Sequence, residues 1–181
     1  MLPDALASVW AQTHDDYQII VNYSEKYWPS KINEAAAAAK GEYLLILCDD
    51  DMIAPTYLAR TVQFMPHADI VTTELRTFGD SEQVWAPRPY AFDHLKLTST
   101  PWITSLVRRS LWEELGGYDE ALIYQDWDFW YRAFKTGAKC VRIHEPLFLY
   151  RLHVSQGTKQ VDQAIAREQI YTKHPELRPD E

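Results

Sequence analysis

The sequence predicts one α/β domain in which helices flank a mainly parallel sheet. Three observations support this prediction. Short apolar runs alternate with helix-like segments along the first half of the chain. One of these runs, YLLILC at 43–48, is apolar throughout, as expected for a strand covered on both faces. The chain has 181 residues, 46% of them hydrophobic, which is enough for one domain with a sizeable core.

The first half of the chain predicts three helices and three strands in alternation. Propensity and pattern place helices at 2–12, 30–43 and 55–65, and strands at 17–21, 43–48 and 69–78. Pro3 suits the first turn of the first helix. Ser30 is expected to cap the second helix and Gly41 to end it.

The second half opens with a segment that has no clear period. Residues 81–101 contain three prolines and are expected to form a long loop with one short strand. The elements expected after it are a strand at 102–109, helices at 110–117 and 124–137, strands at 139–143 and 147–152, and a tail helix at 161–171. We therefore divide the chain into a domain at 1–157 and a helical tail at 158–181.

Composition excludes several classes of protein. A formal net charge of −8 argues against a general nucleic-acid binder, which needs a basic surface. The two cysteines, Cys48 and Cys140, lie in apolar runs and are expected to be reduced core residues. No apolar stretch is long enough to span a membrane, and the first residues lack the basic start of a signal peptide. These features predict a cytoplasmic protein.

Three consecutive carboxylates, Asp49, Asp50 and Asp51, directly follow the apolar run at 43–48. In open α/β sheets, ligands bind outside the carboxyl ends of the strands. Adjacent carboxylates repel each other, and a hard divalent cation such as Mn²⁺ or Mg²⁺ relieves that repulsion. The alternative is a solvated turn with no bound ion.

Other polar groups follow later elements. Asp126 and Asp128 lie at the start of the helix predicted at 124–137, where a carboxylate either caps the helix or acts as a general base. Arg151 and His153 follow a strand and are separated by one residue, so their side chains are expected on the same side. Arg151 suits a phosphate, and His153 suits a metal or a phosphate, although a lone histidine is more often a surface residue.

The order of four segments resembles glycosyltransferase family 2, the inverting transferases of the GT-A fold. The segments are ASVWAQTHDDYQIIV, KINEAAAAAKGEYLLILCDDDMIAP, SLVRRSLWEELGGYDE and YQDWDFWYRAFKTGAKCVRIHEPLFLYRLHVSQGT. Together they span most of the chain, from Leu2 to Thr158. The resemblance implies a donor that is a nucleotide-diphosphate sugar, a Mn²⁺ or Mg²⁺ cofactor, and an acceptor hydroxyl on a saccharide, lipid or protein.

The resemblance also implies roles for individual residues. Asp126 matches the catalytic base, and His153 matches a histidine that reaches the metal or the diphosphate. Counting back from Pro55 places the chief metal carboxylate of the Asp-x-Asp motif at Asp50, whereas a literal reading gives Asp49 and Asp51. The residues implied beside the nucleotide-sugar are Asn22, Lys31, Asn33 and Arg151, and those implied at the sugar or the acceptor are Trp102 and Trp127. Trp130 is expected to belong to the core.

The chain departs from the family pattern in several places. It starts inside the first helix, so the usual first strand is missing, and another segment or a second copy of the chain is expected to fill the gap. Asn22 and Tyr23 stand where an acidic pair is usual, Gln125 replaces a glutamate, and Cys48 replaces an aspartate. These departures leave two alternatives: a degenerate GT-A domain that binds without turnover, and a metal-dependent phosphoryl enzyme.

Overall fold

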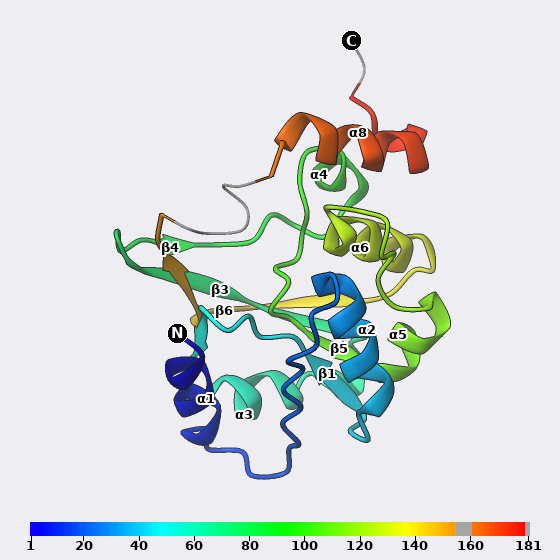
Figure 1. The fold of residues 1–181 in the computed structure, drawn as a ribbon. Coiled ribbons are helices and arrows are strands. Elements are labelled where there is room, and N and C mark those ends of the chain that lie inside the picture. The colour runs from blue at the N-terminus through cyan, green and yellow to red at the C-terminus, as the bar shows by residue number, and fades with distance from the viewer. Residues whose placement is uncertain (155–160, 180–181) are drawn as a thin grey trace.

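A computed structural model describes residues 1–154 and 161–179 (Figure 1). Its helices are α1 (Leu2–Trp10), α2 (Trp28–Ala38), α3 (Tyr57–Val62), α4 (Phe92–Leu95), α5 (Arg109–Leu115), α6 (Gln125–Lys135) and α8 (Gln163–Lys173), with short 3-10 turns at Met65–His67 and Pro175–Leu177. Its strands are β1 (Tyr43–Leu45), β2 (Met52–Ile53), β3 (Ile70–Gly79), β4 (Val84–Trp85), β5 (Leu106–Arg108) and β6 (Cys140–Leu152).

The strands form one sheet in the order β1-β5-β3-β6-β2, and β4 pairs with the outer half of β3. The predicted α/β architecture is confirmed, but the sheet is mixed instead of mainly parallel. Among the described strands only β3 and β6 pair in parallel, while the other pairs are antiparallel. β1, β3 and β6 do run in the same direction. β1 and β3 do not pair with each other, because β5 lies between them and runs in the opposite direction. Each of them therefore pairs with β5 in antiparallel.

The segment at 17–21 does not form the strand that its β-branched residues predict. It is extended, and none of its residues pairs with a strand among the described residues. Ile19 and Val21 remain 37% and 38% exposed. A strand needs a neighbour for its backbone hydrogen bonds, and the described chain supplies none beside this segment.

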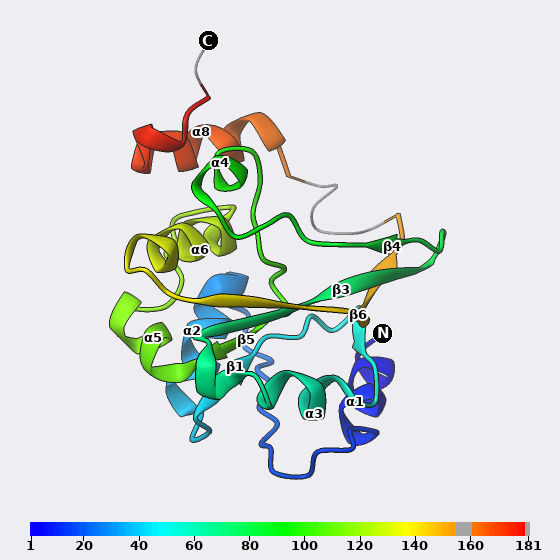
Figure 2. The same cartoon turned by 180° about the vertical axis from the view of Figure 1, so that it is seen from behind.

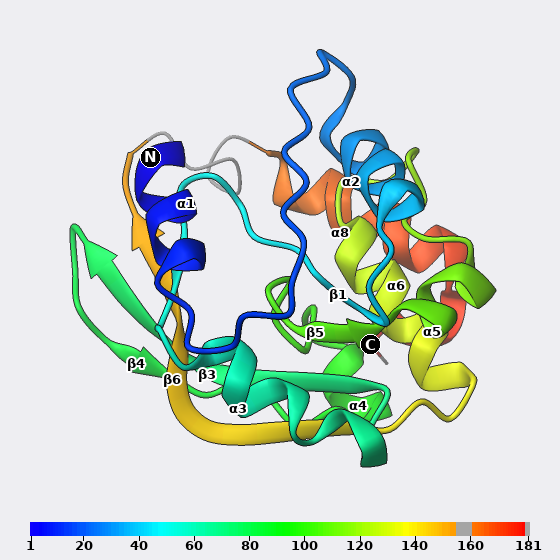
Figure 3. The same cartoon turned by 90° about the horizontal axis from the view of Figure 1, so that it is seen from below.

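Helices cover both faces of the sheet. Figures 1 and 2 show α1 and α3 on one side of β3 and β6, with α4, α6 and α8 on the other side. The view from below shows α2 and α5 grouped beside β1 and β5 (Figure 3). Alternate residues of one strand reach the two layers: Ile70 packs in the core under α6, and Val71 packs in the core beside α3.

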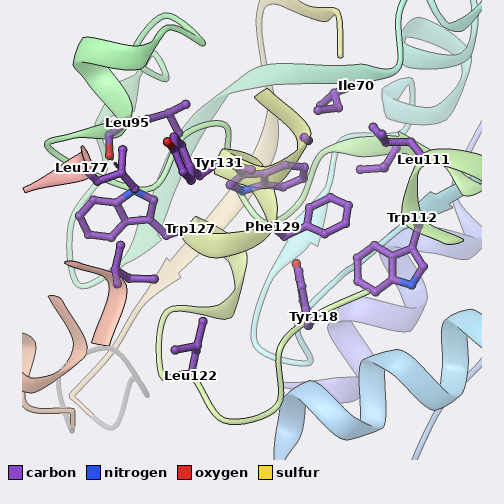
Figure 4. Close-up of a cluster of buried hydrophobic side chains, with 14 residues drawn as sticks. Ile70, Leu95, Leu111, Trp112, Tyr118, Leu122, Trp127, Phe129, Tyr131 and Leu177 are labelled. Atoms are coloured by element: carbon purple, nitrogen blue, oxygen red, sulfur yellow. Dashed lines mark hydrogen bonds between the residues drawn. The ribbon is translucent and has the colours of Figure 1, made fainter. Parts of the chain in front are cut away.

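The largest core is aromatic and lies around α6 (Figure 4). Trp112 packs on Phe129 with ring centroids 4.8 Å apart, and Tyr118 contacts both rings. Ile170 of α8 and Leu177 of the last turn are fully buried in the same cluster. The tail from 161 onward therefore packs on the main core, while the expected boundary at 157/158 lies outside the described residues.

Several boundaries differ from the predicted ones. α2 starts at Trp28 instead of Ser30, whose hydroxyl donates to Glu120 at 2.6 Å. The two strands expected at 139–143 and 147–152 form one strand, β6, which bends through register shifts opposite Glu74. The loop predicted at 81–101 contains the expected short strand, β4, and also the short helix α4.

Other predictions hold in the described residues. α5 ends at Gly116, which takes a left-handed conformation with φ of 73°, as expected for a C-terminal glycine. Cys48 and Cys140 are both free thiols as expected, although each is only partly buried. None of the described helices combines the length and the apolar character needed to cross a bilayer.

Candidate functional site

The acidic run forms a tight turn between β1 and β2. The backbone N–H of Asp51 donates to the carbonyl of Cys48 at 3.2 Å, which closes a turn over residues 48–51. Cys48, Asp50 and Asp51 each place a possible ligand atom within 4.8 Å of the others. Asp51 is only 1% exposed, whereas Asp49 is exposed and lies outside this group.

The end of β6 runs beside this turn, because β2 pairs with β6 through Met52 and Leu149. His153 places Nε2 at 3.0 Å from Oδ2 of Asp50. Arg151 donates its backbone N–H to Oδ1 of Asp51 at 2.9 Å and its Nε–H to the carbonyl of Asp50 at 2.7 Å. Because β1 and β6 run in the same direction, the acidic turn after β1 and the polar residues at the end of β6 lie at the same edge of the sheet, as the sequence predicted.

The electrostatics of the turn favour a bound cation. Burial raises the pKa of Asp51 to about 7; the hydrogen bond from Arg151 opposes this shift, and the charge of Asp50 adds to it. Burial and the surrounding carboxylates also raise the pKa of the Cys48 thiol. A divalent cation would stabilise these groups in their ionised forms, which is the state that binds metals.

Asp126 lies at the start of α6 and faces the same region. Its charge contributes to the raised pKa of both Cys48 and Tyr118, so it is electrostatically close to the turn. Burial raises the pKa of Asp126, while the hydroxyl of Ser99, at 2.7 Å from Oδ2, and the first N–H groups of α6 lower it. A half-buried carboxylate with such partners can accept a proton from a bound hydroxyl.

The residues present fit a divalent cation. The turn offers two carboxylates and a thiol, with the imidazole of His153 hydrogen-bonded to Asp50 behind them. Carboxylate oxygens suit Mg²⁺ and Mn²⁺, and a nearby thiol also tolerates softer ions. The groups able to hold the cation are therefore Asp50 and Asp51, with Cys48 and His153 close by.

Two of the residues predicted beside a nucleotide make hydrogen bonds within the chain. Asn33 donates to the carbonyl of Tyr118 at 2.9 Å and accepts from the N–H of Tyr118 at 2.9 Å, which ties α2 to the turn after α5. Gly117 takes a left-handed conformation with φ of 71°, which favours glycine, and a Cβ there would lie 2.6 Å from Oδ1 of Asn33. Asn22 donates to the carbonyl of Lys31 and to Glu34.

Arg151 is engaged as well. Its guanidinium donates to Asp4 of α1 at 2.7 Å and lies over the ring of Phe78 at 4.5 Å. The arginine thus joins α1, β3 and the acidic turn. Its position supports a role in holding the turn.

The prediction for Trp127 was wrong. Its side chain is 1% exposed in the aromatic core, and its indole N–H donates to the carbonyl of Leu95 at 2.7 Å, so no ring face is open to a sugar (Figure 4). Trp102 is half-buried, and its indole nitrogen has no hydrogen-bond partner among the described residues. Trp130 is fully buried, which confirms its assignment to the core.

Sequence reasoning missed three residues that surround the site. Ser99 lies in a loop without a motif, and only the fold brings it to Asp126. Tyr118 belongs to the GGYDE turn, and its role as a buried neighbour of Asp126 has no sequence signal. Cys48 was read as a core residue, although its position next to three aspartates was visible in the sequence.

Comparison with known proteins supports the fold. No protein-family model matches the chain. An uncharacterized glycosyltransferase of Methanocaldococcus jannaschii is 29% identical over 134 residues, which cover 66% of this chain and 45% of the relative. The chain therefore spans less than half the length of this relative.

Comparison with solved structures also supports the fold. S. aureus TarS 1-349 in complex with UDP-GlcNAc matches with a TM-score of 0.73 at 14% identity, over 89% of this chain and 57% of that one. Mannosyltransferase PcManGT from Pyrobaculum calidifontis, in complex with GDP-Man and Mn²⁺, matches with a TM-score of 0.67 at 13% identity, over 98% of this chain and 63% of that one. The chain has the mixed α/β, GT-A-like fold of these proteins.

Proposed function

We propose that this chain is the nucleotide-sugar-binding part of a metal-dependent glycosyltransferase of family 2. The observation that carries the proposal is the convergence of Asp50, Asp51 and His153 at one sheet edge, with Asp126 facing them. The nucleotide-sugars bound by TarS and by PcManGT support the donor class, and the Mn²⁺ of the latter supports the cofactor. The activity of the whole protein is part of the proposal, because the chain spans only part of each relative.

We assign Asp50 as the chief metal carboxylate. It contacts His153 and belongs to the group of converging ligand atoms, whereas Asp49 is exposed. Asp51 is the second candidate, since it is buried and carries a raised pKa that a cation would lower. A bound Mn²⁺ or Mg²⁺ would neutralise the diphosphate as it departs.

The protein side of the reaction follows from Asp126. Its carboxylate accepts the proton of an acceptor hydroxyl while the hydroxyl oxygen attacks the anomeric carbon. The attack comes from the face opposite the diphosphate, so the configuration at that carbon inverts. Lys31 is half-buried on α2 and remains a candidate contact to the nucleotide, as does Trp102 for the sugar or acceptor.

The sheet is open next to this site. Leu44 is paired with Val107, and Glu42 accepts from the N–H of Arg109, so Tyr43 and Leu45 turn their backbone groups away from β5. No described residue bonds to that edge, and the apolar run at 43–48 stays partly exposed. We propose that an additional strand, from a further segment of the protein or from a second copy, completes the sheet there.

The second candidate function is a non-catalytic GT-A domain. The open edge of β1 and the Gln125 side chain favour it, since Oε1 of Gln125 is buried without a partner among the described residues. Calorimetric titration of UDP and GDP with and without Mn²⁺ tests the metal and donor site. Metal-dependent binding together with transfer from a nucleotide-sugar supports the enzyme, whereas metal-dependent binding without transfer supports the non-catalytic domain. No metal-dependent nucleotide binding would remove the proposed donor site.

A further inference from the structure

Ser99 makes a contact that the proposed reaction does not by itself require. Its Oγ–H donates to Oδ2 of Asp126 at 2.7 Å. The two residues are 27 positions apart and come from different elements: Ser99 follows α4, and Asp126 starts α6. This hydroxyl is the side-chain donor that the structure gives to Asp126.

The loop that carries Ser99 is anchored firmly to α6. Trp127 donates its indole N–H to the carbonyl of Leu95 at 2.7 Å, and Tyr90 donates its hydroxyl to the carbonyl of Trp130 at 2.8 Å. Leu95 is fully buried under these contacts (Figure 4). Both anchors come from the 90–99 segment, so Ser99 is held in place by neighbours that do not depend on its own hydroxyl.

From this geometry we infer that Ser99 is a positioning residue for the base: by donating to Oδ2 it fixes the orientation in which the Asp126 carboxylate receives the proton of the acceptor hydroxyl. The inference rests on the proposed function for the identity of the reaction. The hydrogen bond between Ser99 and Asp126 is observed in the structure and does not depend on the proposed function.

Two physical consequences follow. An oriented carboxylate needs no reorganisation when the acceptor arrives, which lowers the barrier of the chemical step. A hydroxyl that donates to the ionised form also keeps the carboxylate ionised at a lower pH. Loss of the hydroxyl therefore affects both turnover and its pH dependence.

The other groups that face Asp126 do not obscure this effect. Its charge is felt by Tyr118, Tyr124 and Cys48, and the pKa of each of these groups is raised above its usual value. They stay neutral through the range in which a carboxylate titrates. Asp51 titrates in that range, but it is unchanged between the variants, so its contribution cancels in a comparison.

The test compares Ser99→Ala with Ser99→Thr, which retains a hydroxyl. The Ala variant is expected to lower kcat by about 10- to 100-fold with an unchanged KM for the donor, and to move the acidic limb of kcat upward by roughly one pH unit. The Thr variant is expected to recover most of both losses. Ser105→Ala is the matched control, because Ser105 also makes side-chain hydrogen bonds in the following segment but does not touch Asp126.

A second readout separates this inference from the proposed function. The ¹³C carboxyl signal of Asp126, identified by its absence in Asp126→Asn, is titrated in both Ser99 variants without any substrate. A higher midpoint in the Ala variant alone supports the inference even if no transfer is observed. Equal midpoints, or an Ala variant with an unchanged kcat and pH profile, would overturn it. Turnover that survives in Asp126→Asn would instead show that the proposed base is wrong.

Discussion

Nε2 of His153 lies 3.0 Å from Oδ2 of Asp50, across 103 positions of the chain. The pair joins the end of β6 to the turn after β1, and among the three consecutive aspartates it involves Asp50. Asp49 is exposed and takes no part in the converging group. The contact therefore supports the proposed assignment of Asp50 as the chief metal carboxylate.

Substitution of Asp50 tests this assignment. We expect Asp50→Ala to weaken Mn²⁺-dependent UDP or GDP binding by at least about 100-fold, because it removes a ligand and leaves His153 without its carboxylate partner. Asp49→Ala is the matched control and should change the affinity by less than about threefold. Calorimetry with both variants measures the difference. Equal losses in the two variants would contradict the assignment of Asp50.

Substitution of Asp126 tests the base. Asp126→Asn preserves the shape of the side chain and can still accept a hydrogen bond from Ser99, but it takes up a proton far less readily. We expect transfer to fall by about 10²- to 10⁴-fold, while the affinity for the metal-bound nucleotide changes little. Single-turnover kinetics and calorimetry measure the two quantities. Weakened nucleotide binding of similar size would indicate a structural role for Asp126.

Much of the fold follows from local sequence pattern. The continuous apolar run at 43–48 located β1, the strand pattern at 69–78 located β3, and the glycine after Leu115 marked the end of α5. The strand at 17–21 was wrong because a strand depends on its neighbour, and no neighbouring strand is present in the described chain. The direction of β5 also depends on which strands it pairs with, and the local sequence pattern carries no information on that pairing.

The candidate site also combines residues that the local sequence predicts with residues that it does not. The acidic turn and His153 were predicted because their residue types are unusual next to strands. Ser99 and the burial of Trp127 were not, since both depend on how the loop after α4 packs on α6. Long-range contacts between ordinary residues leave no signal in a single sequence.

The raised pKa of Asp51 predicts a pH-dependent metal affinity. Its folded pKa of about 7 lies above the usual value of an aspartate, so the carboxyl is largely protonated below pH 7 and a cation must displace that proton. We expect the apparent Mn²⁺ affinity to fall by up to tenfold for each pH unit below 7 and to level off above it. Metal titrations in buffers of different ionisation enthalpy should show proton release on binding. An affinity that is constant between pH 5.5 and 7.5 would exclude this coupling.

The open edge of β1 predicts rapid amide exchange. The N–H groups of Tyr43 and Leu45 face away from β5, and those of Ile19 and Val21 bond to no described residue. We expect all four amides to exchange quickly in the isolated chain, while Val71, which lies between β5 and β6 in the sheet, stays protected. Hydrogen-exchange mass spectrometry at two protein concentrations measures this. Protection of 43–45 that grows with concentration would identify a second copy as the source of the additional strand.

Asp128 predicts a pH-dependent stability. Its carboxylate is buried between α6 and α8, where it accepts from His174 at 2.7 Å, Lys173 at 2.8 Å and Arg132 at 2.8 Å. Burial alone would raise its pKa, but these partners outweigh burial and lower the pKa to about 2. A lowered folded pKa contributes stability that is present above the unfolded value near 4 and is lost as the pH falls toward 2, with a size of about 2 kcal/mol.

Asp128→Asn should therefore destabilise the chain by about 3 kcal/mol at pH 7, because three cationic or donor groups lose the charge that they face. Glu168→Gln is the matched control, since Glu168 pairs with Arg178 on the exposed side of α8 and its loss should have a much smaller effect on stability. Urea unfolding at pH 7, 4 and 3 measures both variants. The difference between the unchanged chain and Asp128→Asn should shrink between pH 4 and 3, because the unfolded chain takes up a proton at Asp128 in this range while the folded chain, with its lowered pKa, does not. A difference that stays constant over this range would show that folding does not lower the pKa of Asp128.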